Sequence, residues 1–293
     1  MLKLLIFTTI LFLSGCTFKN TPHINALEAE AKAHESHVGT IYKNIVYKST
    51  LMHTLHLDLY MPLVKRYKHA PIYIYIHGGS WLRGDKELVN VYYKTVEGLR
   101  NKGIAVVSID YRFVSQSGIE AMVEDCRDAL VFVQEHADMY GLDAHRIGLH
   151  GHSAGANLAL LTGFKHSELT DDILFIVDEY GPTDAVKLLQ ERKDRVWWTY
   201  FISDNDLNQL SPIQKIHPLI PPVYIAHGDA DTMVPLVQSK HLYKALQANT
   251  IESRLVILKG AEHGYKGLSD IQIQEHRQEV LAYMLAKFKA SEQ

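Results

Sequence analysis

The sequence has little cysteine, no excess of charge of either sign, and no recognisable metal-binding motif. Lys plus Arg total 30 and Asp plus Glu total 33, a net charge of -3, which argues against a nucleic-acid partner. The 17 histidines are scattered, without an H-E-x-x-H or C-x-x-C grouping, so we expect no metal and no cofactor. No internal repeat or low-complexity tract interrupts the 293 residues. With 47% hydrophobic residues, the chain can bury one large core.

The first sixteen residues form a separate signal. Lys3 precedes an apolar stretch from Leu4 to Leu13, which is shorter than the ~20 residues that a membrane-spanning helix needs. The following Leu13-Ser14-Gly15-Cys16 resembles the lipoprotein box of bacteria. The resemblance implies cleavage before Cys16 and lipid attachment to that residue. An uncleaved membrane anchor is the alternative.

Lipid attachment at Cys16 predicts a protein of the bacterial cell envelope. Thr17, in place of Asp, favours the outer membrane or the cell surface. Residues 17–40 are polar and predict a tether. Processing leaves Cys126 as the sole thiol of the folded part, and its helical context predicts a small buried apolar residue. We therefore expect contact with the membrane through the anchor alone.

From residue 41 to 293, strand and helix patterns alternate. Residues 40–48 and 54–62 alternate apolar and polar side chains and predict an antiparallel pair. Short apolar runs that suit buried parallel strands lie at 71–79, 104–111, 146–153, 173–180, 222–229 and 254–264. Helical patterns lie at 86–102, 118–140, 154–166, 235–248 and 270–289. The pattern predicts one α/β domain with a mostly parallel eight-stranded sheet and helices on both faces.

Residues Gly151-His152-Ser153-Ala154-Gly155 fit G-x-S-x-G, the pattern of a nucleophilic serine on a sharp strand-to-helix turn. Alone, the motif is weak, because a structural turn can carry the same residues. Here a strand pattern precedes it and a helix pattern follows. The start of a helix also directs amide donors toward negative charge that develops near the serine. The context favours Ser153 as a nucleophile.

His77-Gly78-Gly79-Ser80 directly follows an earlier apolar strand. Two successive glycines allow backbone N–H groups to point into a cleft, as an oxyanion hole requires. A plain turn is the alternative for this stretch taken alone, but its position 76 residues before Ser153 favours the oxyanion role.

A serine nucleophile needs a base and a carboxylate that orients the base. Asp229 and Asp231 follow one apolar strand, and His263 follows the next. The order serine, aspartate, histidine is that of α/β-hydrolases. Each of these residues lies just past a predicted strand, where open α/β sheets place their ligand sites.

Six motifs together resemble the α/β-hydrolase-fold carboxylesterases, in the branch of hormone-sensitive lipase and bacterial acetyl and feruloyl esterases. They are "HGGSWLRGDK", "DYR" at 110–112, "GHSAGANLA", "LSPI" at 210–213, "HGDADTMVP" and "KGAEHGY". The resemblance implies Ser153 as nucleophile, Asp231 as acid and His263 as base, with no cofactor or metal. It further implies that the oxyanion hole uses backbone N–H groups of the loop Gly78, Gly79 and Ser80, and of Ala154.

The sequence departs from this family at two places. Ser80 stands where the family often has a further glycine, and no proline follows "DYR". A backbone donor survives the first change, whereas the second puts the fit of the substrate in doubt. The family pattern H-G-x-x-D-x-x-V-P selects Asp231 as the acid and leaves Asp229 as a turn residue.

Several residues near these motifs receive no catalytic role. We interpret His152 as the variable position of the serine motif, with no catalytic role, and His227 as a packed or hydrogen-bonded residue. Trp81 is expected to line the cleft or pack beneath it, and Glu179 has no assigned role. Residues 183–209 predict a small cap whose aromatic segment, 197–201, forms either a lid or a packing surface.

The sequence therefore predicts a serine hydrolase that cleaves short-chain carboxylic esters through an acyl-enzyme. The expected substrate is a small-molecule or carbohydrate ester, such as an acetylated polysaccharide. Two alternatives stay open: an amidase of the arylformamidase kind, and a lipid-anchored binding protein without activity. The sequence does not assign an oligomeric state.

Overall fold

The computed structural model describes residues 39–165, 171–191 and 204–291. The signal peptide 1–16, almost all of the tether 17–40 and the aromatic segment 197–201 lie outside these residues. Among the described helices, none combines the length and the apolar character that crossing a membrane requires.

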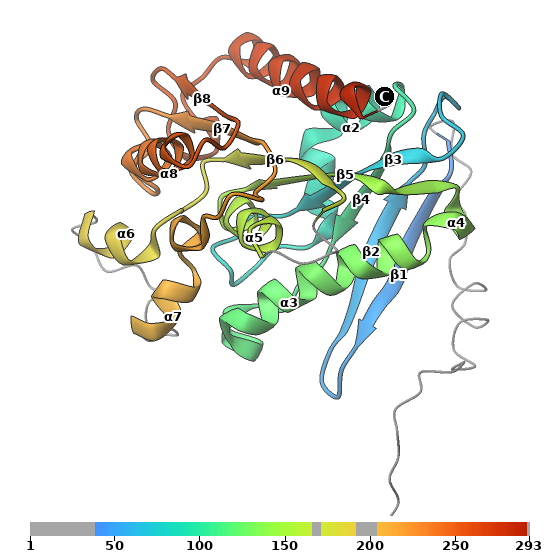
Figure 1. Ribbon diagram of the computed structural model, residues 1–293, viewed down its shortest axis with the longest axis horizontal. Helices are drawn as coiled ribbons and strands as arrows, with labels where there is room; N and C mark the ends of the chain where they lie inside the picture. Colours follow the sequence, from blue (N-terminus) through green and yellow to red (C-terminus); the bar gives the residue numbers. More distant parts are fainter. Residues whose placement is uncertain (1–38, 166–170, 192–203, 292–293) are drawn as a thin grey trace, which may run out of the picture.

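Eight strands form one sheet in the order β1-β2-β4-β3-β5-β6-β7-β8 (Figure 1). β1 pairs with β2 and β2 with β4 in antiparallel fashion, and all the other pairs are parallel. The strands are β1 Ile41–Ser49, β2 Thr54–Tyr60, β3 Ala70–Ile76, β4 Ala105–Ile109, β5 Leu142–His152, β6 Ile173–Glu179, β7 Val223–Gly228 and β8 Ser253–Leu258. The predicted fold, a mostly parallel eight-stranded α/β-hydrolase sheet, is confirmed.

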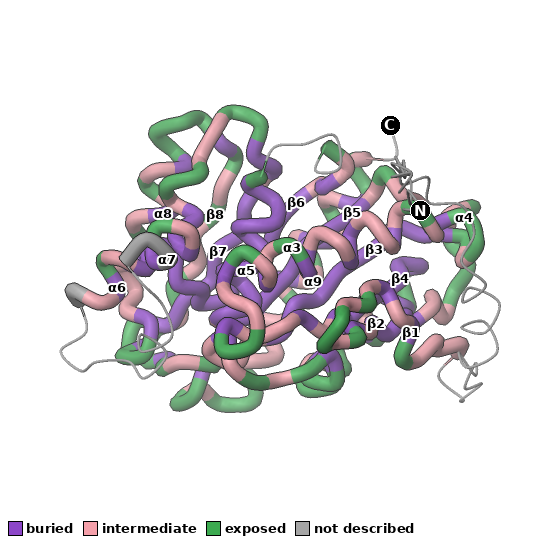
Figure 2. Tube along the Cα trace, turned by 90° about the horizontal axis from the view of Figure 1, so that it is seen from below, coloured by how far each residue is buried: buried purple, intermediate pink, exposed green. Residues whose placement is uncertain are grey.

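Burial along the strands follows their place in the sheet. In β2 the alternating Leu55, Leu57 and Leu59 share one buried face, as period-two patterning requires. Every residue of β3 and β4 is buried, because helices cover both faces of the central strands. β8 lies at the edge and is partly exposed. In Figure 2 the buried residues accordingly concentrate along the central strands.

Helices cover both faces of the sheet (Figure 1). α2 and α9 pack over one apolar core, and α3, α5 and α8 pack over the other. The helices are α2 Tyr93–Arg100, α3 Val114–Glu135, α4 Ala137–Tyr140, α5 Ala154–Gly163, α6 Ala185–Glu191, α7 Asp204–Gln209, α8 Val237–Ala248 and α9 Asp270–Ala290.

Two helical segments differ from the sequence-based expectation. The segment predicted as a helix over 86–102 begins as a 3-10 helix, Lys86–Tyr92, and continues as α2. The helix predicted over 118–140 begins earlier, bends at Gly118 (φ 79°) and breaks before α4. Hydrophobic periodicity indicates that a helix exists, but it does not register such a local change of backbone conformation.

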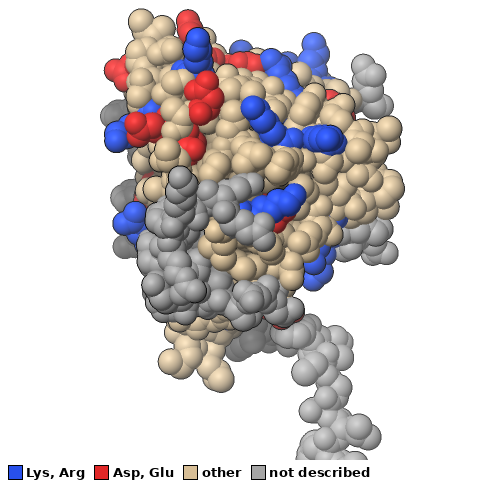
Figure 3. Space-filling view, turned by 90° about the vertical axis from the view of Figure 1, so that its left-hand side faces the viewer, with Lys and Arg blue, Asp and Glu red and all other residues tan. Residues whose placement is uncertain are grey.

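Within the described part of the predicted cap, α6 and α7 precede a short 3-10 helix, Pro212–Lys215. Asn157 of α5 fixes the base of this region, because its Nδ2 donates to the carbonyls of Pro182 and Leu210 at 2.8 and 2.9 Å. The "LSPI" motif therefore has a structural task. Figure 3 shows acidic and basic side chains side by side along the upper part of one face, as the near balance of charges leads one to expect.

Candidate active site

Four parallel strands of the sheet, β3, β5, β7 and β8, bring the predicted site residues to one edge. β3 ends before the glycine loop and β5 ends before Ser153. β7 ends three residues before Asp231, and β8 ends five residues before His263. Because parallel strands end at the same edge, segments far apart in the chain meet there.

Ser153 occupies a strained turn between β5 and α5, with φ 53° and ψ -120°. The turn requires its two glycines. A Cβ on Gly151 would lie 2.3 Å from the backbone of Gly155, and a Cβ on Gly155 would lie 2.1 Å from the carbonyl oxygen of Ile76. The N–H of Ser153 donates to the carbonyl of Glu179 at 2.9 Å, which ties the turn to β6. Such strain is typical of a nucleophilic elbow.

The structure brings Ser153, His263 and Asp231 into one hydrogen-bonded chain. Nε2 of His263 lies 2.9 Å from Oγ of Ser153, and Nδ1 of His263 lies 2.7 Å from Oδ2 of Asp231. The other carboxylate oxygen of Asp231 accepts from the backbone N–H groups of Met233 and Val234 at 2.8 and 2.9 Å. The carboxylate is thereby fixed against rotation.

The surroundings of Asp231 keep it ionised. Burial raises its pKa, but hydrogen bonds from His227 and His263 outweigh burial, so the pKa lies well below its usual range. An ionised carboxylate can only accept a hydrogen bond, so Nδ1 of His263 carries the hydrogen and donates it to Asp231. Nε2 is left free to accept from the Ser153 hydroxyl.

Asp229 and His227, which precede Asp231, occupy the turn and the buried position that we expected from the sequence. Asp229 is exposed, and its Oδ1 accepts from the backbone N–H of Gly260 at 2.6 Å, so it supports a turn. His227 is fully buried and lies 2.6 Å from Oγ of Ser239 and 2.7 Å from the carbonyl of Val234. Of the two aspartates, Asp231 alone contacts His263 in the described structure.

The glycine loop after β3 packs directly against the elbow. A Cβ on Gly78 would lie 2.8 Å from the carbonyl oxygen of His152 and 3.5 Å from Cβ of Ser153. Gly79 has φ 129°, and a Cβ there would lie 1.8 Å from the carbonyl oxygen of Arg83. Ser80 and Trp81 continue the loop with φ of 57° and 60°. The loop thus lies beside Ser153, the residue that directly precedes α5.

The "DYR" motif holds this loop in place. The Tyr111 hydroxyl donates to the carbonyl of His77 at 2.8 Å, and the two rings stack with centroids 4.3 Å apart. Nδ1 of His77 lies 2.7 Å from the carbonyl of Gly78, and burial lowers the pKa of His77 to about 4. Arg112 binds Asp125 of α3 through two nitrogens at 2.7 Å. Trp81 is buried and packs in the core cluster beneath the loop.

Two residues near the site received no role from the sequence. Tyr180, directly after β6, has φ 48° and places its ring edge-to-face against His263, with centroids 4.9 Å apart. Glu179 is buried, and its Oε2 lies 2.7 Å from Nε2 of His152, the residue before Ser153. The spacing of His150 and His152 on one strand face was the available signal, but their partner is defined only by strand register.

Taken together, the sheet order, the elbow and the serine–histidine–aspartate chain define an α/β-hydrolase-fold protein with the side-chain arrangement of a serine hydrolase. The BD-FAE family model matches residues 57–246, and the chain belongs to this family.

Curated relatives carry the names of esterases. A probable isoprenylcysteine alpha-carbonyl methylesterase of Oryza sativa subsp. japonica is 29% identical over 231 residues, which cover 71% of this chain and 53% of the relative. An acetyl esterase of Salmonella dublin is 26% identical over 210 residues, which cover 65% of this chain and 64% of that protein. The chain spans about half the length of the first curated relatives it matches. The esterase family that the six motifs predict is confirmed at this level.

Solved structures share the fold at lower sequence identity. A truncated carbohydrate esterase from gut microbiota has a TM-score of 0.72 at 20% identity, covering 88% of this chain and 99% of that chain. An inhibited esterase B from Lactobacillus rhamnosis has a TM-score of 0.73 at 21% identity, covering 92% of this chain and 93% of that chain. These likenesses support the fold assigned to the chain.

Proposed function

We propose that this protein is a serine hydrolase that cleaves short-chain carboxylic esters through an acyl-enzyme. The observation that carries the proposal is the hydrogen-bonded chain Ser153–His263–Asp231, with separations of 2.9 and 2.7 Å, at the carboxyl ends of the strands. The esterase names of the relatives support the same reaction class.

In the proposed reaction, Nε2 of His263 accepts the Ser153 proton as Oγ attacks the ester carbonyl. Asp231 orients the ring and stabilises the imidazolium that forms. Backbone N–H groups of the loop Gly78–Ser80 and of Ala154 donate to the oxyanion; removing one such donor typically costs about 10²–10³ in rate. His263 then protonates the departing alcohol, and a water molecule, deprotonated by His263, hydrolyses the acyl-enzyme.

We infer that the substrate carries a small group on one side of its ester bond. One relative is named for acetyl esters and others for methyl esters, so each name specifies a short acyl or a short alcohol. For this chain we propose the short acyl side, on a small-molecule or carbohydrate alcohol. The carbohydrate esterase among the structural neighbours fits that choice.

The direct test measures hydrolysis of p-nitrophenyl acetate, butyrate and octanoate by the full chain and by Ser153→Ala. We expect kcat/KM to fall with acyl length and the variant to lose at least about 10⁴-fold in kcat. A fluorophosphonate probe should label the wild type alone. Labelling of both proteins, or of neither, would refute Ser153 as the nucleophile.

The two other functions give different results in the same assays. An amidase of the arylformamidase kind would hydrolyse N-formylkynurenine faster than p-nitrophenyl acetate. A binding protein without activity would neither react with the probe nor turn over any ester. Methyl esters of long acids, tested beside the acetates, separate the short-alcohol preference from the short-acyl preference.

We further infer that the protein is anchored by lipid at Cys16 to a bacterial envelope membrane, with the outer membrane or the cell surface as the site that Thr17 favours. The support is the lipoprotein-like box at 13–16. Globomycin, which blocks lipoprotein signal peptidase, should cause the uncleaved precursor to accumulate.

A further inference from the structure

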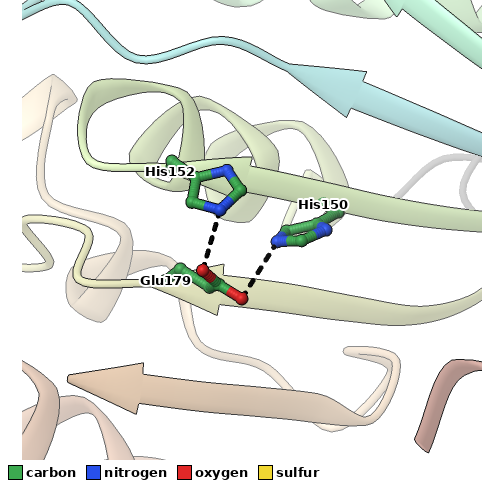
Figure 4. A group of neighbouring side chains, drawn as sticks. All are labelled: His150, His152 and Glu179. Carbon is green, nitrogen blue, oxygen red and sulfur yellow. Dashed lines mark ion pairs between the residues drawn. The ribbon is translucent and has the colours of Figure 1, made fainter. Parts of the chain in front are cut away.

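A second group of ionisable side chains lies behind the nucleophile, on the face of the sheet that α2 and α9 cover. His150 and His152 alternate on β5, and Glu179 ends β6, where strand register places it opposite His152. Figure 4 shows both rings directed at one carboxylate. Nε2 of His152 lies 2.7 Å from Oε2 of Glu179, and Nε2 of His150 lies 3.5 Å from Oε1.

A third histidine approaches from the covering helix. Nε2 of His276, on α9, lies 3.4 Å from Oε1 of Glu179 and 3.1 Å from the hydroxyl of Tyr265. The four side chains of the cluster are each at most 5% exposed. Within the described residues, these histidines are the ion-pair partners of Glu179, and no lysine or arginine pairs with it. A buried carboxylate without a permanent counter-charge is costly.

Several ring nitrogens of this cluster lack ordinary hydrogen-bond partners. Nε2 of His150, both ring nitrogens of His152 and Nδ1 of His276 are buried without a hydrogen bond of acceptable geometry in the described structure. Buried polar atoms are normally paired, so four such atoms in one cluster require an explanation. The hydroxyl of Tyr73 lies 2.5 Å from Nδ1 of His150, an outer contact of the kind that orients metal-binding histidines.

We propose that His150, His152 and Glu179 bind a divalent transition-metal ion, with Zn²⁺ as the ion to test first. Their ligand atoms lie within 4.8 Å of one another, and two imidazoles with one carboxylate are a donor set that Zn²⁺ accepts. His276 offers a further imidazole next to the same carboxylate, with its Nε2 3.4 Å from Oε1 of Glu179. Metal–ligand bonds of about 2.0–2.1 Å in a tetrahedral site separate ligand atoms by roughly 3.3 Å. The contacts at 3.4 and 3.5 Å fit that spacing, and the 2.7 Å contact must widen by about half an ångström.

Such an ion would connect β5 to β6 where the elbow begins. His152 immediately precedes Ser153, and the carbonyl of Glu179 accepts the Ser153 N–H. The ion supplies the missing counter-charge and holds two strand ends together. Its role is structural, and no step of the proposed ester hydrolysis passes through it. Because the ligands are buried beneath Tyr92, whose ring stacks on His152 at 3.9 Å, the ion should exchange slowly.

The test begins with the metal content of the full chain, produced without a histidine tag in zinc-supplemented medium and dialysed against EDTA. Plasma mass spectrometry should find one zinc per wild-type chain. Glu179→Gln and His152→Gln should lose it, whereas His145→Gln, at an exposed histidine, should retain it. Changes outside the ligand shell already weaken metal binding about 10–100-fold, so ligand loss should weaken it by at least about 100-fold.

Two further readouts on the wild type keep the proposal testable if a variant fails to fold. Refolding with Co²⁺ in place of Zn²⁺ should produce the visible d–d absorption of a four-coordinate nitrogen/oxygen site. Refolding without metal should lower the melting temperature by several degrees, and zinc should restore it.

The proposal is overturned if the wild-type chain carries no zinc and its melting temperature does not change with Zn²⁺ or Co²⁺. The cluster is then a buried carboxylate surrounded by histidines without a metal ion. Zinc retained equally by Glu179→Gln and His152→Gln also overturns it, because the bound metal then lies elsewhere. Neither result affects the proposed esterase, whose test depends on Ser153 labelling.

Discussion

At the scale of single residues, the choice between Asp229 and Asp231 has a sharp kinetic consequence. Asp231→Asn should lower kcat by about 10⁴-fold, because an amide no longer holds His263 in the tautomer that accepts the serine proton. Asp229→Asn keeps the oxygen that accepts from Gly260 and should change kcat less than about threefold. Steady-state kinetics on p-nitrophenyl acetate compares the two. A larger loss from Asp229→Asn would reverse the assignment.

His77 supplies a prediction of pH dependence. Burial lowers its pKa from 6.5 to about 4, so the folded protein holds it neutral while the unfolded chain binds a proton below 6.5. Its contribution to stability is therefore complete above pH 6.5, is lost as the pH falls to about 4, and changes no further below that. The loss amounts to at most about 3 kcal/mol.

His77→Asn tests this statement, because its amide can still donate to the Gly78 carbonyl but does not titrate. The free energy of unfolding, measured by urea denaturation, should fall less for the variant than for the wild type between pH 7 and pH 4. Between pH 7 and pH 9 the two curves should run parallel. A constant difference across the acid range would show that burial of His77 has no such effect.

The sequence predicted the serine, the aspartate and the histidine of the candidate site better than it predicted their surroundings. Ser153, Asp231 and His263 stand in motifs whose chain order is informative on its own. The Glu179–His152 pair joins two strands, and only their register places these residues side by side. Tyr180 likewise depends on a local left-handed backbone that no periodic pattern encodes.

At the scale of elements, close contact between α5 and β3 explains why the elbow needs Gly155. An alanine Cβ there would lie 2.1 Å from a main-chain oxygen of Ile76, which cannot rotate away. Gly155→Ala should therefore cost at least about 2 kcal/mol of unfolding free energy, as overpacking does. Thermal or urea unfolding measures the loss.

Gly163→Ala, at the other end of the same helix, is the matched control. Its Cβ would meet Cδ1 of Ile176 at 2.5 Å, and that flexible side-chain end can move. Higher helix propensity then offsets part of the crowding, so stability should stay within about 1 kcal/mol of the wild type. Equal losses at both positions would mean that rigid backbone contact is not what the elbow requires.

All eight strands were predictable: β1 and β2 from the alternation of apolar and polar residues, and the other six from short apolar runs bounded by polar loops. The boundaries of the helices were less predictable than the strands. Gly118 bends α3, and the segment before α2 winds as a 3-10 helix, since local backbone geometry and the packing of Val89 override the 3.6-residue period. The conformation of the cap over 192–203 lies outside the described residues.

At the scale of the whole molecule, the site depends on distant parts of one chain. His263 reaches a serine 110 residues earlier and an aspartate 32 residues earlier, and the parallel sheet aligns all three. Chain order alone suggested this convergence because α/β connections are right-handed and neighbouring strands end together. The sequence pattern does not specify the acyl pocket, because pocket shape depends on how loops pack.

If lipid at Cys16 anchors the protein, a change at this residue should alter its location in the cell without altering its activity. The described sheet begins at β1, Ile41–Ser49, so 24 residues separate Cys16 from this strand in the sequence. Cys16→Ser should remove the lipid and leave the sheet, the elbow and the triad unchanged. After cell fractionation, the wild type should sediment with membranes and the variant should not, while kcat/KM and melting temperature agree within error.

Because several acyl chains give firm attachment, salt washing should not release the wild type. A variant that stays with the membrane through such washes would show that the apolar stretch Leu4–Leu13, not lipid at Cys16, holds the protein there.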